Sequence, residues 1–133
     1  MKTTVLDASA LLAMFFGQPG MEQVRELFHK ASEADKPMLI GAVNWAEVLY
    51  KLEHKHGTEG VAMARRFEHT MPLAVELVDR DMAEAAASLK VEYGLGLADA
   101  FAAALSKSKK AELVTADTEF KSVEKEIKIN WLK

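Results

Sequence analysis

The sequence contains no cysteine among its 133 residues. This excludes disulfide bonds, thiolate zinc sites and a cysteine nucleophile, so any bound metal would need oxygen or imidazole ligands. The chain also lacks a run of about 18 uncharged apolar residues, the length that a membrane-spanning helix requires. Met1 and Lys2 lead directly into a β-prone run, without the apolar stretch of a secretory signal. We therefore expect a cytoplasmic protein that makes no contact with a membrane.

A surplus of positive charge is missing as well, since the formal net charge is −3. Nucleic-acid-binding proteins usually carry an excess of Lys and Arg. The charge is uneven, however. From Lys107 onward seven Lys stand against five acids, a balance of +2, whereas residues 1–106 carry ten Lys and Arg against fifteen acids, a balance of −5. The basic tail suits a phosphate-facing surface, although such a charge run is more often only a solvated face.

Glycine and proline are few, with seven and three residues, and they separate stretches of helical or strand-like periodicity. With half of its residues hydrophobic and 28% charged, the chain has the composition of one compact domain spanning residues 1–133. Strands are expected at residues 3–6, 38–40, 74–78, 113–115 and 127–132. Helices are expected at residues 9–16, around 24–31, and at 44–56, 58–69, 81–93 and 97–107, with a short helix around Phe120.

Alternation of strands and helices predicts an α/β fold, a three-layer α/β/α sandwich around a central parallel sheet of about five short strands. Ligands of such sheets bind beyond the carboxyl ends of the strands. Asp7 and Asp117 each follow an apolar strand and precede a helix. Their carboxylates converge if the two strands are neighbours. The alternative is that each side chain only caps the helix that follows it.

Two further acids lie within predicted helices. Asp99 lies in the first turn of its helix, opposite a stripe of large apolar side chains and beside small residues. Periodicity alone makes it a surface acid that the helix dipole favours. Glu47 points away from the main apolar stripe of its helix, which by itself indicates a solvated residue. Asn44, one turn earlier, lies near enough to bond the same ligands.

Four segments resemble the PIN-domain pattern in order and spacing: residues 5–13, 44–49, 94–100 and 113–120. The match spans nearly the whole chain and is most similar to the stand-alone VapC-type toxins, whose domain is one α/β/α unit of this length. The resemblance implies four catalytic metal ligands, Asp7, Glu47, Asp99 and Asp117, with the hydroxyls of Ser9 and Thr115 in support. Asn44 and Glu119, where relatives often have other polar residues, are expected as additional contributors.

The function implied by this resemblance is that of a metal-dependent endoribonuclease, a hydrolase that acts as the toxin of a toxin–antitoxin pair. It also implies an RNA substrate, a cognate antitoxin and a homodimer. Oxygen ligands and the absence of cysteine favour Mg²⁺ or Mn²⁺ over zinc. A bound cation would also invert the local field where phosphate approaches, which offsets the acidic net charge. Basic residues that could contact the RNA backbone are Arg65, Arg66, Lys107, Lys109 and Lys110.

Two alternatives remain open at this point. A phosphatase of the haloacid-dehalogenase type would use Asp7 as its nucleophile, although such enzymes usually carry a second Asp two residues on, where this chain has Ser9. The other alternative is a PIN-like binding module without catalytic activity. Cleavage of RNA in the presence of a divalent cation would separate these possibilities.

Overall fold

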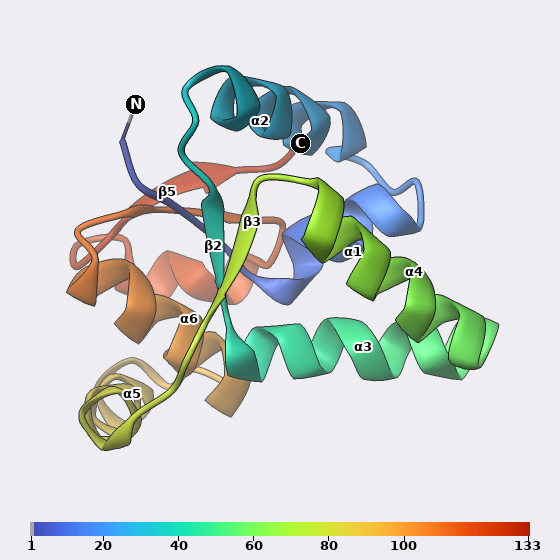
Figure 1. The fold of residues 1–133 in the computed structure, drawn as a ribbon. Coiled ribbons are helices and arrows are strands. Elements are labelled where there is room, and N and C mark those ends of the chain that lie inside the picture. Colours follow the sequence, from blue (N-terminus) through green and yellow to red (C-terminus); the bar gives the residue numbers. More distant parts are fainter. Residues whose placement is uncertain (1) are drawn as a thin grey trace.

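The computed structural model describes residues 2–133, so Met1, the first residue of the predicted domain, lies outside the described residues. The chain runs through the following elements (Figure 1): β1 (Thr4–Leu6), α1 (Ala8–Phe15), α2 (Met21–Glu33), β2 (Met38–Gly41), α3 (Ala42–His56), α4 (Thr58–Thr70), β3 (Leu73–Glu76), α5 (Arg80–Tyr93), α6 (Leu97–Ser108), β4 (Glu112–Thr115), the 3₁₀ helix η1 (Thr118–Val123) and β5 (Lys128–Trp131). None of the helices in residues 2–133 combines the length and apolar character needed to cross a membrane.

Within the described chain, five parallel strands form one sheet in the order β3-β2-β1-β4-β5. The chain builds outward from β1 to β3 and then returns to the other side of β1 to add β4 and β5. The strand order therefore reverses between β1 and β4, which is where parallel sheets bind their ligands. This confirms the predicted three-layer α/β/α fold and makes the strands that precede Asp7 and Asp117 neighbours.

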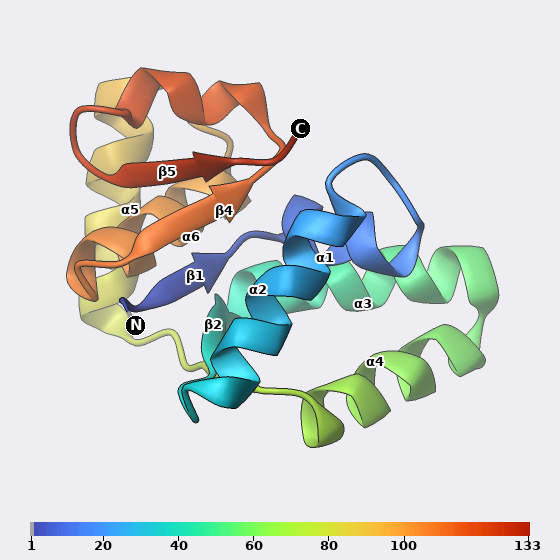
Figure 2. The same cartoon turned by 90° about the horizontal axis from the view of Figure 1, so that it is seen from above.

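Each face of the sheet carries its own hydrophobic core, because successive side chains of a strand point to opposite faces. Leu6 and Val114 belong to the core beneath α1, α2, α3 and α4, whereas Val5 and Leu113 belong to the core beneath α5 and α6. Figures 1 and 2 show α5 and α6 on one side of the sheet and α1, α2 and α4 on the other. Strand residues buried on both sides explain the short, continuously apolar runs of the sequence.

Helix α6 packs through its small residues. Ala102, Ala103 and Ser106 are fully buried, while Leu97, the first member of the expected apolar stripe, is 58% exposed. The hydroxyl of Ser106 donates to the carbonyl of Ala102 within the helix, so burial leaves it satisfied. Small side chains let the helix axis lie close to the sheet. This close packing sets the position of Asp99, which lies in the first turn of α6.

Helices α3 and α4 also approach each other closely, at Gly60. A Cβ atom at this position would overlap the carbonyl oxygen of Leu52, so only glycine fits. The two helices thus form a tightly packed pair, and α3 begins directly after β2, with Gly41 as its N-terminal cap. The first turns of α3 consequently lie at the carboxyl ends of the strands.

Candidate metal centre

Asp7 lies between β1 and α1 and is buried, with 2% of its surface exposed. Its Oδ1 accepts hydrogen bonds from the hydroxyl of Ser9 (2.8 Å) and the backbone N–H of Ala10 (3.0 Å). Its Oδ2 accepts from the hydroxyl of Thr115 (2.6 Å). The side chain therefore does cap α1, as the simpler interpretation held. It is at the same time joined to the end of β4.

The hydroxyls of Ser9 and Thr115 tie the ends of β1 and β4 together. Their oxygens lie 3.3 Å apart, and Ser9 Oγ also accepts from the backbone N–H of Ala116 (3.0 Å). Thr115 Oγ1 accepts from the N–H of Asp117 (2.9 Å) while it donates to Asp7. Asp117 in turn caps η1 by accepting from the N–H of Glu119 (3.0 Å). The two loops that carry Asp7 and Asp117 thus form one hydrogen-bonded unit.

Three carboxylates meet beside this unit. Asp99, Asp117 and Glu119 each offer an oxygen, and these oxygens all lie within 4.8 Å of one another. Asp99 comes from α6, whereas Asp117 and Glu119 come from the segment that links β4 to η1. Hard oxygen donors at this spacing suit Mg²⁺ or Mn²⁺, which prefer carboxylate ligands. Glu119, expected only as a supporting residue, is placed as centrally as Asp99 and Asp117.

The crowding of acids shows in their proton affinities. Burial raises the pKa of Asp99 to about 8, with further contributions from the neighbouring carboxyls of Asp117, Asp7 and Glu119. Burial also raises the pKa of Asp7 to about 6, against the lowering effect of its three hydrogen bonds. Both carboxyls therefore hold protons more tightly than carboxyls in water. A divalent cation would remove this repulsion, so the donor set fits one.

Glu47 is not part of the three-carboxylate group. It lies on α3, where its Oε2 pairs with the ammonium of Lys51 at 3.0 Å, and its side chain is 27% exposed. Asn44, one turn earlier, is buried and donates from Nδ2 to the carbonyl of Ala98 (3.1 Å), next to Asp99. Its Oδ1 has no hydrogen-bond partner among the described residues. Asn44 thus joins the helix of Glu47 to the helix of Asp99.

Comparison with known proteins identifies the family. The model of the PIN domain family matches residues 4–126. This chain therefore belongs to the PIN domain family. The sequence matches no curated protein.

Solved structures agree with this assignment. The VapBC2 complex of Rickettsia felis, bound to a promoter DNA fragment, matches with a TM-score of 0.80 at 14% identity, over 98% of this chain and 99% of that one. DNA-bound VapBC of Salmonella typhimurium matches with 0.77 at 21% identity, over 98% of both chains. VapC20 of Mycobacterium tuberculosis, a toxin that cleaves the sarcin–ricin loop, matches with 0.72 at 20% identity, over 91% and 95%. At these identities the likeness shows a shared VapC-like fold.

Proposed function

We propose that this chain is a metal-dependent endoribonuclease that hydrolyses phosphodiester bonds of RNA. The observation that carries the proposal is the group formed by Asp99, Asp117 and Glu119, whose oxygens lie within 4.8 Å of one another at the switch point of a parallel sheet. Membership of the PIN domain family and the sarcin–ricin-loop-cleaving neighbour VapC20 support RNA as the substrate.

The proposed ligands of Mg²⁺ or Mn²⁺ are the four catalytic acids, Asp7, Glu47, Asp99 and Asp117, together with Glu119. A bound cation supplies Lewis acidity, which activates water and neutralises the charge that develops on the scissile phosphate. Ser9 and Thr115 orient Asp7 through the hydrogen bonds described above. Asn44 holds α3 against the start of α6. Glu47 would join the ligands after leaving its ion pair with Lys51.

A phosphatase that uses Asp7 as its nucleophile is disfavoured by the surroundings of that residue. Both of its oxygens accept hydrogen bonds, and its side chain is almost completely buried. A nucleophilic oxygen must reach the phosphorus of a substrate, and a side chain with 2% of its surface exposed leaves no room for that approach. The orientation of Asp7 instead suits a residue that fixes the geometry of its neighbours and adds negative charge to a cation site.

Cleavage of a structured RNA by the wild-type chain, with Mg²⁺, with Mn²⁺ and with chelator, tests this function. We expect cleavage only in the presence of a divalent cation. Asp99→Asn should lower the rate about 100-fold or more, because it removes a carboxylate ligand. The matched control is Asp81→Asn, an exposed acid in the first turn of α5, which should cleave like the wild type.

The outcomes separate the possibilities. If Asp99→Asn cleaves RNA at the wild-type rate, the ligand assignment is wrong. If the wild-type chain cleaves no RNA at any metal concentration, while the cation still raises its melting temperature, the chain is a metal-binding module without nuclease activity. If a covalent phosphate can be trapped on Asp7, the phosphatase interpretation is supported instead.

We also propose that the chain is the toxin of a toxin–antitoxin pair, with a protein antitoxin as its partner, and that it forms a homodimer. The VapBC complexes among the structural neighbours support the antitoxin. The dimer has weaker support in the exposed apolar side chains of Leu77 and Val91, each 87% exposed. Growth arrest on expression of the wild-type chain, absent with Asp99→Asn, would support the toxin role. Sedimentation of the purified chain would give its oligomeric state.

A further inference from the structure

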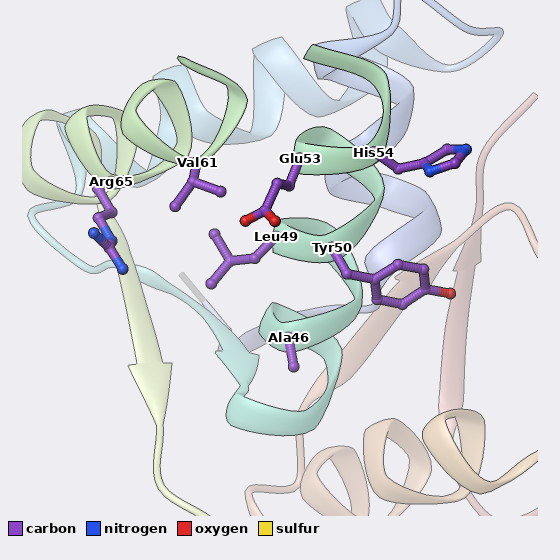
Figure 3. Close-up of a pocket in the computed structure, with 7 residues that line it drawn as sticks. All are labelled: Ala46, Leu49, Tyr50, Glu53, His54, Val61 and Arg65. Atoms are coloured by element: carbon purple, nitrogen blue, oxygen red, sulfur yellow. The ribbon is translucent and has the colours of Figure 1, made fainter. Parts of the chain in front are cut away.

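Beyond Glu47, helix α3 presents Tyr50, Lys51 and His54 on the side that carries Glu47. Residues spaced by three, four and seven positions share one face of a helix. Figure 3 shows Tyr50 and His54 pointing to one side of α3, while Leu49 and Glu53 point to the other, toward Val61 and Arg65 of α4. We call the face formed by Glu47, Tyr50, Lys51 and His54 the α3 rim.

Lys51 places a positive charge at the edge of the acidic centre. Its Nζ lies 3.0 Å from Glu47 Oε2, and 43% of its side chain is exposed. Lysine side chains are charged at neutral pH, so Lys51 carries a positive charge directly beside Glu47. An RNA strand approaching these acids would meet this ammonium beside the proposed ligand Glu47.

Tyr50, next to Lys51, is an aromatic residue with 60% of its surface exposed. Exposed aromatic rings beside a cationic group are the usual platform for single-stranded nucleic acid, because every base has a face that can stack. On the other side of α3, Leu49 and Glu53 point toward Val61 and Arg65 of α4, so that side combines apolar side chains with charges of both signs. The mixture of an ammonium, an imidazole and a stacking ring on the α3 rim suits a strand of phosphates and bases.

We propose that the RNA strand leaves the metal centre along the α3 rim, with Lys51 bound to a phosphate beside the scissile one and Tyr50 stacked on an adjacent base. This inference rests on the proposed ribonuclease function. Lys51 changes partner in the complex: Glu47 turns to the cation, and the released ammonium binds the phosphate. Both side chains bind substrate, and neither takes part in bond breaking.

Steady-state cleavage of one RNA oligonucleotide over a series of salt concentrations tests this path. Lys51→Met should raise KM about tenfold with kcat little changed, and should make the dependence of log(kcat/KM) on log[salt] shallower by about 1, because one phosphate contact is lost. Tyr50→Ala should raise KM about tenfold with an unchanged salt slope, and Tyr50→Phe should restore the wild-type KM. Lys30→Met removes the same charge from the last turn of α2, in the segment that leads to the amino end of β2, and should behave like the wild type.

Binding of Mn²⁺ measured by calorimetry supplies a readout apart from cleavage. If Lys51 binds substrate, Lys51→Met should bind Mn²⁺ at least as tightly as the wild type, because Glu47 has lost a competing cation. Weaker Mn²⁺ binding would mean that Lys51 only positions Glu47, and would overturn the proposal. It is also overturned if the wild type cleaves RNA and both Lys51→Met and Tyr50→Ala keep the wild-type KM. A wild-type chain that cleaves no RNA refutes the ribonuclease function itself.

Discussion

At Asp7, burial beside the carboxyl ends of β1 and β4 outweighs three hydrogen bonds, and the pKa of the carboxyl rises to about 6. At Asp99, which is only half-buried, the nearby carboxyls add to the effect of burial and the pKa rises to about 8. Asp7 is thus held in place by hydrogen-bond donors, whereas Asp99 lies close to other carboxylates that repel its charge. The two carboxyls therefore contribute differently to stability.

Thr115→Val tests the hydrogen-bonded unit around Asp7. The substitution keeps the shape of the side chain but removes the donor to Asp7 Oδ2 and the acceptor for the Asp117 N–H. Leaving buried polar groups unpaired should lower the free energy of unfolding by about 1–3 kcal/mol. Urea denaturation in the presence of chelator measures this loss.

Thr70→Val is the matched control for that experiment. The hydroxyl of Thr70 donates to the carbonyl of Arg66 at an exposed site, so its removal should change the free energy of unfolding by less than about 0.5 kcal/mol. Equal losses in the free energy of unfolding for Thr115→Val and Thr70→Val would show that the hydrogen bond to Asp7 contributes no more than an exposed one.

At the level of elements, the proposed metal centre depends on how three segments meet. Helix α6 carries Asp99, and the segment after β4 carries Asp117 and Glu119. Helix α3 carries Glu47, which would join these three carboxylates only after leaving Lys51. The bond from Asn44 Nδ2 to the carbonyl of Ala98 joins α3 to the first turn of α6. It therefore sets how far Glu47 lies from Asp99.

Asn44→Ala should weaken this junction. We expect a loss of about 1–2 kcal/mol in the free energy of unfolding, because the buried side chain and its hydrogen bond are both lost. We also expect about tenfold weaker binding of Mn²⁺, because Glu47 and Asp99 are no longer held together. Calorimetric titration and urea denaturation measure the two effects, and Gln18→Ala, at an exposed amide, is the control. Unchanged metal affinity would show that Asn44 acts on stability alone.

Over the whole molecule, the raised pKa values give the metal-free protein a distinct pH dependence. The folded chain binds the protons of Asp99 and Asp7 more tightly than the unfolded chain, whose Asp pKa is about 3.8. This stabilisation is fully present below pH 4, and it is lost as pH rises through about 6 for Asp7 and about 8 for Asp99. A cation that replaces these protons should bind more tightly as pH rises.

We therefore expect the metal-free wild type to lose stability relative to Asp99→Asn between pH 5 and pH 8. The difference should be on the order of 1 kcal/mol, since solvent screens a half-exposed carboxyl. Saturating Mn²⁺ should raise the melting temperature of the wild type, and more at pH 8 than at pH 6. Thermal scans of both proteins, with Asp81→Asn as control, measure this. A parallel pH dependence of wild type and Asp99→Asn would contradict the assignment of the proton to Asp99.

Local patterns in the sequence were enough to predict the α/β sandwich and the positions of Asp7 and Asp117. The signal is local: within a few residues, a short apolar strand is followed by an acid and then by the start of a helix. The acid therefore lies at the carboxyl end of the strand, independently of the rest of the chain. The same local signal left open the alternative that Asp7 caps its helix, and the structure shows that it does. Capping a helix does not prevent Asp7 from acting on other acids, since burial, the neighbouring Asp117 and the charge of Asp7 together raise the pKa of Asp99.

The tertiary structure decided which acids gather. Periodicity indicated a surface position for Asp99, because the large apolar side chains of its helix lie on the opposite face. This pattern cannot show that α6 packs through its alanines, close to the sheet. The central place of Glu119 depends on the turn of η1 after Asp117, and the pairing of Glu47 with Lys51 depends on side-chain conformation. The sequence alone thus determined the fold class and the two acids at the strand ends. The packing distance of α6 and the strand order β1-β4 decided the rest, because they arise from contacts between residues far apart in the chain.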